Sequence, residues 1–411
     1  MLVFVTSWNM LSDNKHNTVQ ETDMNMRKLT LASVLLTTST IADANSFAID
    51  ARSLAMGNAS VATANIATAA LANPAMLVLQ GGREDFALLL PAVGVYVDDS
   101  DQLIDAIDQF QVDSDACVAN GNPASAACSA ATASFNNLVG KALAPQVTGA
   151  VALGLSGDEY TFAFSARANA SLAGGVDLTT VDTSPIGLRD PDSNIIELRG
   201  VATTEIGVSL ATKLQLAGMP ISIGITPKVV SVENVVFRES AASLDTGVGD
   251  LVDEDQVTDL GSFTTMDAGV MIGLTDNVQF GIVGRNLISE ELVDNSGVTP
   301  VTLKFDPSFR AGIAYTGDTI TLGVDLDLTE NDPIITTFGA QKTQLLSIGA
   351  ELDAFDIAQL RVGMQQNMAD GANDDALITA GVGLWLGFTL DLSVLAGEDV
   401  FGAFLQTGFR W

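Results

Sequence analysis

The stretch from Ala376 to Trp411 alternates between two kinds of side chain, and this alternation restricts the fold more than any other feature. From Ala376 to Ala396 every even position is apolar, whereas the odd positions are mostly small, polar or charged. After Gly402 the pattern resumes, and the apolar face ends with Phe409 and Trp411. A period of two predicts extended strands whose successive side chains lie on opposite faces.

Both a soluble β-sandwich and a transmembrane β-barrel alternate in this way. The strands here run about ten residues, which is the length that crosses a bilayer at a tilt of about 45°. Their polar face is rich in Gly and Ser, as suits a crowded barrel interior. An aromatic end at Phe409 and Trp411 is typical of the terminal strand that the barrel-assembly machinery recognises. The sequence therefore favours a transmembrane barrel, with these two residues on its lipid face as the insertion signal.

The N-terminal region contains the features of a secretory signal. Residues 26–44 begin with a basic pair, continue with an apolar run and end with the small-x-small sequence Ala42-Asp43-Ala44. This order predicts a cleaved signal peptide and a mature protein that begins at Asn45. Two interpretations fit the polar leading segment 1–25: an over-extended gene start, or a cytoplasmic extension that is lost with the signal.

The composition excludes several kinds of chemistry. The single histidine, His16, precedes the signal, so the mature chain lacks Ser-His-Asp triads and histidine-ligated metal sites. Removing residues 1–44 takes away three of 18 basic and four of 50 acidic residues and leaves a net charge of −31. Nucleic acid is an implausible partner at that charge. We expect no enzyme activity, no cofactor, no metal and a monomer.

The only two cysteines, Cys117 and Cys128, lie close together in a Gly-, Ala- and Ser-rich insert at about 98–144. In an oxidising compartment two such cysteines are expected to pair. The sequence predicts a structural disulfide.

The segment 45–82 is rich in small apolar residues and precedes the first predicted strand. Its Ala51-Arg52, Met56-Gly57 and Asn73-Pro74-Ala75 resemble the N-terminal plug of FadL-like outer-membrane proteins, and within that group the barrel-type TraF family of conjugal plasmid transfer. The alternative is a surface helix that ends at Pro74, because the residue before proline resists helix. The resemblance implies a helical plug and assigns plug and ligand-path roles to six residues: Arg52, Met56, Gly57, Asn73, Pro74 and Ala75.

The region 83–411 divides into about 14 strands, an even number as bacterial single-chain barrels have. Long and tight connections alternate along it, as an up-and-down antiparallel barrel requires. The predicted strands are 84–97, 145–156, 159–174, 196–214, 220–236, 263–274, 277–287, 301–316, 318–328, 343–354, 356–366, 375–387, 388–397 and 400–411.

Charged residues within these strands fall on the polar face. A charge on the lipid face costs roughly 2–4 kcal/mol at mid-bilayer, so the charged face is expected to line the lumen. Because both signs occur, we expect mainly paired structural charges; a role in selectivity is the alternative. The predicted lumen charges are Arg167, Glu205, Lys228, Asp267, Arg285, Lys304, Asp306, Arg310, Asp325, Asp327, Glu351, Arg361, Asp391 and Arg410.

Most of the remaining negative charge lies in the predicted loops, as in the sequence from Asp370 to Asp375. The simpler interpretation is that these residues lie in solvated outer loops. The alternative is that they bind divalent cations that bridge to lipopolysaccharide, since carboxylates are suitable ligands for calcium and magnesium.

Two functions follow from the resemblance. The first is passive transport of small hydrophobic molecules across the outer membrane of a Gram-negative bacterium. The second is a TraF-type accessory or structural role in conjugation without transport. The mostly polar lumen weakens the first, although the apolar residues of segment 45–82 can supply an apolar surface.

The cleavage site gives a direct test. N-terminal sequencing of the protein from the cell envelope should begin at Asn45, because Ala42-Asp43-Ala44 places the cut after Ala44. A start near Met1 in the membrane-embedded form would contradict secretion through this signal.

Overall fold

The fold is that of a computed structural model. It describes residues 50–78, 86–99, 102–122, 124–138, 141–157, 159–175, 195–216, 218–240, 257–295, 300–332, 342–354, 357–370 and 376–410. The predicted signal peptide, the leading segment and Trp411 lie outside these ranges.

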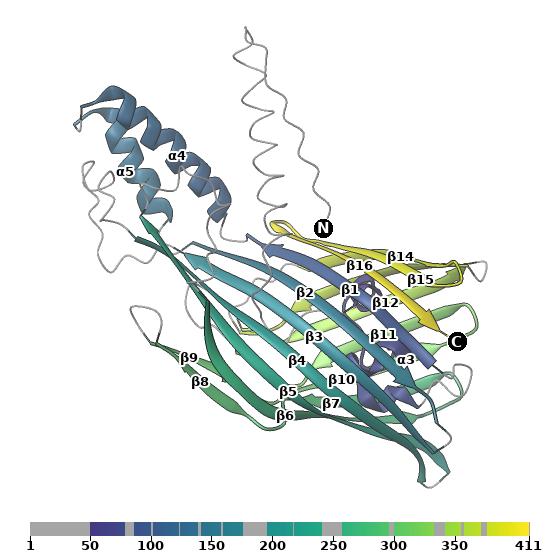
Figure 1. Cartoon of the computed structure of the whole chain (residues 1–411). Helices are drawn as coiled ribbons and strands as arrows, with labels where there is room; N and C mark the ends of the chain where they lie inside the picture. The colour runs from purple at the N-terminus through teal and green to yellow at the C-terminus, as the bar shows by residue number, and fades with distance from the viewer. Residues whose placement is uncertain are drawn as a thin grey trace, which may run out of the picture.

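The main body is a closed antiparallel barrel of 14 strands, each paired with its neighbours along the chain (Figure 1). The first strand closes the barrel on the last, with a register that runs from Ala87 opposite Arg410 to Asp98 opposite Val400. The barrel strands are β1 (Phe86–Asp98), β2 (Ala142–Leu155), β3 (Tyr160–Gly175), β4 (Ile195–Leu216), β5 (Met219–Ser240), β6 (Val257–Gly273), β7 (Val278–Arg285), β10 (Ser308–Thr316), β11 (Ile320–Asp327), β12 (Leu345–Ala354), β13 (Ala358–Asn367), β14 (Leu377–Trp385), β15 (Thr389–Ala396) and β16 (Val400–Arg410).

The predicted fold class and strand number are confirmed. Six short connections, such as the one at Gly218 between β4 and β5, lie at one end of the barrel, which we call the turn end. The longer connections lie at the opposite, loop end, together with the short connection between β15 and β16. The C-terminus is at the turn end (Figure 1).

The two faces of each strand separate as the alternation predicts. On β3 the aromatic residues Tyr160, Phe162 and Phe164 point outward and are about half exposed, whereas Arg167 on the opposite face is buried. Phe409 likewise points outward from β16. An apolar outside and a polar inside are the arrangement of a transmembrane barrel.

One predicted strand, 301–316, is wrong. It is divided into β9 (Val301–Phe305) and the barrel strand β10, and β9 pairs with β8 (Glu290–Asp294) in a separate two-stranded sheet. Two predicted lumen charges are therefore misplaced. Lys304 is half exposed and forms an ion pair with Glu291, and Asp306 is exposed beyond β9. The hairpin alternates like a barrel strand, so its local pattern does not reveal which sheet it joins.

The insert between β1 and β2 folds into two helices, α4 (Leu103–Asn120) and α5 (Ala126–Leu138), which stand away from the barrel at the loop end (Figure 1). Their contact is an apolar core of their own, in which the rings of Phe110 and Phe135 lie 5.4 Å apart. The predicted disulfide between Cys117 and Cys128 is present within this core.

The N-terminal segment forms three short helical pieces: α2 (Ala51–Ala55), α3 (Ile66–Ala72) and the 3₁₀ turn η1 (Pro74–Leu77). Residues 50–78 are almost entirely buried, and their helices contact strands around the inner wall of the barrel. We call this segment the plug. None of the helices in the described ranges is both long and apolar enough to cross a membrane.

The separate core of α4 and α5 predicts a local effect of the disulfide. Replacing both Cys117 and Cys128 by serine should increase proteolysis between the two helices, because the remaining contact is the small core alone. The heat-modifiable migration of the barrel should not change, since inter-strand hydrogen bonds hold the membrane crossings. Loss of the folded barrel band in this variant would contradict the independence of the insert.

Candidate functional site

The plug and the wall that surrounds it form the candidate site. α2 packs against β13 to β16, α3 against β1 to β3, and η1 against β3 to β6. The three pieces therefore contact different sectors of one closed wall. The plug contacts lie in the half of the barrel near the turn end, since its wall partners, such as Gly224, Gly323 and Gly349, are a few residues from the tight turns.

The start of α2 is fixed by a capping residue. Asp50 precedes the helix in extended conformation, and its carboxylate accepts hydrogen bonds from the backbone N–H and the hydroxyl of Ser53, at 2.9 and 2.6 Å. Such a cap satisfies N–H groups that the helix cannot pair. α2 is followed by a turn with positive φ at Gly57 and Asn58. This turn redirects the chain along the wall toward Val61.

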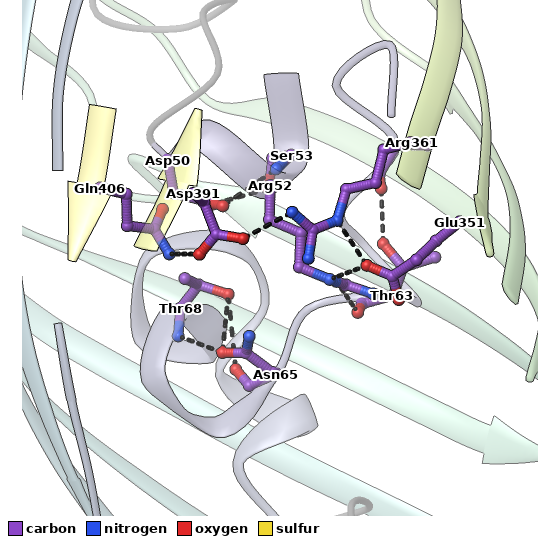
Figure 2. A network of polar contacts seen from close by, with 11 residues as sticks. Asp50, Arg52, Ser53, Thr63, Asn65, Thr68, Glu351, Arg361, Asp391 and Gln406 are labelled. Carbon is purple, nitrogen blue, oxygen red and sulfur yellow. Dashed lines mark hydrogen bonds and ion pairs between the residues drawn. The ribbon is translucent and has the colours of Figure 1, made fainter. Parts of the chain in front are cut away.

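A network of ion pairs joins α2 to the wall (Figure 2). The Nε and Nη2 atoms of Arg52 each donate to one carboxylate oxygen of Glu351 on β12, at 2.8 Å. Arg361 on β13 donates to the same carboxylate at 2.6 Å and to Asp391 on β15 at 2.5 Å. The backbone N–H of Ala51 donates to the Gln406 side chain at 2.9 Å, which extends the network to β16. The network thus spans β12, β13, β15 and β16, and α2 itself is bonded to the first and the last of these strands.

The two charged plug residues differ in their electrostatic environment. Burial raises the pKa of the Asp50 carboxyl above its ordinary value, against the opposing effect of the hydrogen bonds from Ser53. Burial alone would lower the pKa of Arg52, but the facing Glu351 carboxylate outweighs it and the pKa is raised. Arg52 therefore remains a cation, and its charge is matched by the wall.

The chain after α2 is held by a second wall carboxylate. Asp325 on β11 accepts hydrogen bonds from the backbone N–H groups of Ser60 and Val61, at 2.7 and 2.8 Å. Beside it, Arg310 on β10 forms an ion pair with Asp327. The polar side of the plug therefore extends from β16 to β10.

The end of the plug is built on Asn73-Pro74-Ala75. The Asn73 side chain caps η1 by accepting from the N–H of Ala75 at 3.1 Å, and its amide donates to the Val61 carbonyl at 3.0 Å. Ser222 on β5 donates to the Ala75 carbonyl at 2.8 Å. Pro74 is the first residue of η1, where its fixed φ suits the turn and its missing N–H has no consequence.

Inward-facing glycines on the barrel wall leave the space that the plug occupies. A side chain at Gly349 would place its Cβ 2.3 Å from the Met56 carbonyl oxygen, and one at Gly363 would place it 2.2 Å from the Gly57 nitrogen. Gly57 itself lies against the backbone of β12 and β13, where a Cβ would lie 2.4 Å from the Met364 carbonyl oxygen. Plug backbone and wall backbone are therefore in direct contact here. At several other wall glycines an added side chain would also press against the plug: Gly154, Gly224, Gly269, Gly323 and Gly381.

A second group of charges crosses β3 to β6. Arg167 on β3 pairs with Glu205 on β4, and Lys228 on β5 lies 2.9 Å from Glu205 and 3.0 Å from the Asp267 carboxylate on β6. Arg285 on β7 donates to the Leu71 carbonyl of the plug at 3.1 Å. Opposite charges thus alternate across neighbouring strands.

The structure brings most of the predicted lumen residues together in these contacts. Arg410 stands apart from them, near the turn end, with its guanidinium 5.6 Å from the centre of the Trp385 ring. Met56 is fully buried between α2 and the wall. The uncharged wall partners Thr379, Gln406 and Ser222 were not predicted. Their inward position follows from the alternation, but their plug contacts join residues far apart in the chain.

In the described part of the chain, no group of three or more His, Cys, Asp or Glu side chains is arranged to hold a metal ion. The acidic sequence from Asp370 to Asp375 lies largely outside that part. The buried charges form ion pairs between the plug and the wall and between strands of the wall. Their evident physical effect is to hold a polar-lined lumen closed.

Fold and plug together define a plugged transmembrane β-barrel. The chain belongs to the family described as "F plasmid transfer operon, TraF, protein", whose model matches residues 70–327. No curated protein matches the chain.

Solved structures of the same fold include hydrocarbon transporters. The Ralstonia pickettii toluene transporter TbuX is 12% identical, with a TM-score of 0.51 over 88% of this chain and 98% of that one. The P. putida toluene transporter TodX is 13% identical, with a TM-score of 0.52 over 90% and 99%. A Pseudomonas aeruginosa FadL homologue is 13% identical, with a TM-score of 0.53 over 89% and 99%. At these identities the likeness shows the fold alone.

Because Glu351 pairs with both Arg52 and Arg361, its substitution should loosen the plug more than substitution of Arg52. Glu351→Gln removes the partner of two guanidinium groups, whereas Arg52→Gln leaves Glu351 paired with Arg361. Breaking a buried ion pair costs about 3–5 kcal/mol. Hydrogen–deuterium exchange of residues 51–57 should therefore increase in both variants, and more in Glu351→Gln.

The matched control is Lys342→Gln, which removes an exposed ion pair with Glu330 at the loop end. Exposed pairs contribute little, so exchange in the plug should not change. A larger effect of Arg52→Gln than of Glu351→Gln would contradict the shared-carboxylate interpretation.

Proposed function

We propose that the protein lies in the outer membrane of a Gram-negative bacterium and admits small hydrophobic molecules passively, with the plug closing the lumen at rest. The main support is the plug itself, which is buried and in backbone contact with the wall. A passive transporter needs a lumen that is closed at rest, because an open lumen of this size would leak polar solutes.

The related structures support the same class. Two of them are described as toluene transporters, and they share nearly the full length of the barrel. The segment 45–82 is proposed to act as the plug domain of such a transporter. Within it, Arg52, Met56 and Gly57 hold one side and Asn73, Pro74 and Ala75 the other.

A second candidate is a structural or accessory role in conjugal plasmid transfer, which the description of the family favours. In that case the barrel would place the α4–α5 insert and the loops at the cell surface, and the plug would keep the membrane sealed. No hydrophobic ligand would be required.

Permeability separates the two functions. The wild-type protein should pass no polar sugars in a liposome-swelling assay, whereas cells that carry it should take up an uncharged hydrophobic probe faster than cells without it. Gly363→Ala should let sugars pass, because its Cβ would lie 2.2 Å from plug backbone and force the plug to shift. Gly149→Ala is the control, since its Cβ would meet nothing closer than 3.9 Å.

Free passage of sugars through the wild-type protein would overturn the closed plug. A sealed wild-type barrel that adds nothing to hydrophobic uptake, but whose loss lowers plasmid transfer between cells, would establish the second function in place of the first.

A further inference from the structure

The plug is attached to the barrel wall by different kinds of contact on its different sides. On the side of β10 to β16 it is joined to the wall by the ion pair of Arg52 and by the hydrogen bonds of Asp325. On the side of β1 and β2 it is joined mainly by α3, with a smaller contact of α2 on β1. The last carbonyls of α3 also accept hydrogen bonds from Arg285 on β7. Among the described residues, no hydrogen bond links α3 to β1 or β2.

The wall behind α3 carries no charge. Between Phe86 and Val97 on β1, and between Gln146 and Leu155 on β2, the inward positions are small, apolar or uncharged. α3 covers Leu89, Ala92 and Ala150, which are at most 4% exposed. The contacting residues of α3 are equally apolar and include Ile66, Ala67, Ala69, Ala70 and Leu71. We call this contact the apolar seam.

A polar row borders the apolar seam on its loop-end side. The strand registers place Gly94, Thr148, Asn169 and Thr203 next to one another across β1 to β4. Thr148 donates to the Asn169 side chain at 2.6 Å. The hydroxyl of Thr203 is buried, with the residue only 1% exposed, and among the described residues it has no hydrogen-bond partner. An unpaired buried hydroxyl is costly unless something binds it.

A small pocket opens at the same place. It is lined by Gly94, Tyr96, Gln146, Thr148 and Asn169, among others, and lies two positions along β1 and β2 from the residues that α3 covers. It is too tight for a water molecule as it stands. Its lining comes from β1, β2 and β3, and Asn169 within it is the register neighbour of Thr203, so the pocket connects the seam with the polar row.

We propose that the apolar seam between α3 and β1–β2 is the ligand path, that α3 is the movable part of the plug, and that α2 stays fixed. This inference rests on the proposed transport function. The ligand is a small uncharged molecule with an apolar body and a single hydrogen-bonding group. The apolar body replaces α3 against Leu89, Ala92 and Ala150, and the polar group binds the Thr203 hydroxyl. A charged ligand is excluded, because the inward positions of β1 and β2 that α3 covers carry no charge to pair with it.

Two engineered disulfides test which part moves. In Ile66→Cys/Gly154→Cys the bond joins α3 to β2, where a Cβ at position 154 would lie 3.1 Å from the Ile66 side chain. In Ala59→Cys/Gly323→Cys the bond joins the fixed side to β11, with the two Cβ atoms 3.4 Å apart. The second spacing is close to the Cβ–Cβ distance of disulfides, and the first shows that position 154 directly faces the side chain of residue 66.

Uptake is followed in intact cells by the fluorescence of N-phenyl-1-naphthylamine, an uncharged probe with one N–H group. The α3 lock should reduce uptake to that of cells without the protein, and reduction should restore it. The lock at positions 59 and 323 should leave uptake within about twofold of the same variant after reduction, a comparison that removes the effect of the new side chain at 323 on Thr63. Wild-type cells given the same oxidant and reductant control for the native disulfide.

Two further measurements test the ligand chemistry. The anion 8-anilino-1-naphthalenesulfonate has the same apolar skeleton, and its uptake should not exceed that of cells without the protein. Thr203→Val keeps the shape and removes the hydroxyl. It should raise the concentration of N-phenyl-1-naphthylamine needed for half-maximal uptake by about two- to tenfold, as expected for one neutral hydrogen bond.

The outcomes distinguish this inference from the proposed function. Wild-type cells that take up no more probe than cells without the protein would overturn transport itself. If wild type takes up the probe but only the lock at positions 59 and 323 blocks it, transport stands and the seam is wrong. Equal uptake of the anion, or an unchanged Thr203→Val variant, would overturn the assigned ligand chemistry.

Discussion

The pairing of the first strand with the last is the interaction on which the rest of the structure depends. A sheet inside a bilayer has no water to satisfy its edge, so all backbone groups must be paired by closing the barrel. Here β1 meets β16 over a register that extends from Ala87 to Asp98. The C-terminal stretch must therefore be a full membrane-crossing strand with a continuous lipid face, and this explains why its alternation is so regular.

Closure of the barrel creates a lumen, and the charges and the plug follow from it. A charged side chain on a strand costs least when it points inward, and where it is buried there it needs a counter-charge because it has lost its contact with water. Arg361 on β13 has two such partners, Glu351 on β12 and Asp391 on β15. The plug then fills the remaining space. Glycines at the wall let its backbone approach closely enough for small residues such as Ala55 to pack without side-chain bulk.

The parts of this structure that were predictable from sequence are those set by local periodicity. The number of strands follows from counting the segments that alternate. The inward direction of Arg167 and Asp391 and the outward direction of Phe409 follow from the alternation within each strand. The β8–β9 hairpin alternates equally well, so Lys304 was assigned to a barrel strand although it lies, half exposed, on a hairpin that is not part of the barrel sheet. Pairings such as Arg52 with Glu351 join residues 299 positions apart, and no local pattern specifies them. The plug was predicted only through resemblance.

The unequal attachment of the plug has a physical consequence for any opening of the lumen. A plug bound equally on all sides would either stay shut or leave the barrel, since the same interactions would fail together. The contacts of α2 are directional and charged, and breaking one buried pair costs about 3–5 kcal/mol. The contacts of α3 with β1 and β2 are dispersion and apolar burial alone. An apolar molecule makes the same kind of contact with Ala92 and Ala150, so it can replace α3 there with little change in free energy. It carries no positive charge that could replace Arg52 at Glu351. A hydrophobic ligand therefore competes with one side of the plug only, and the other side remains to reseal the lumen.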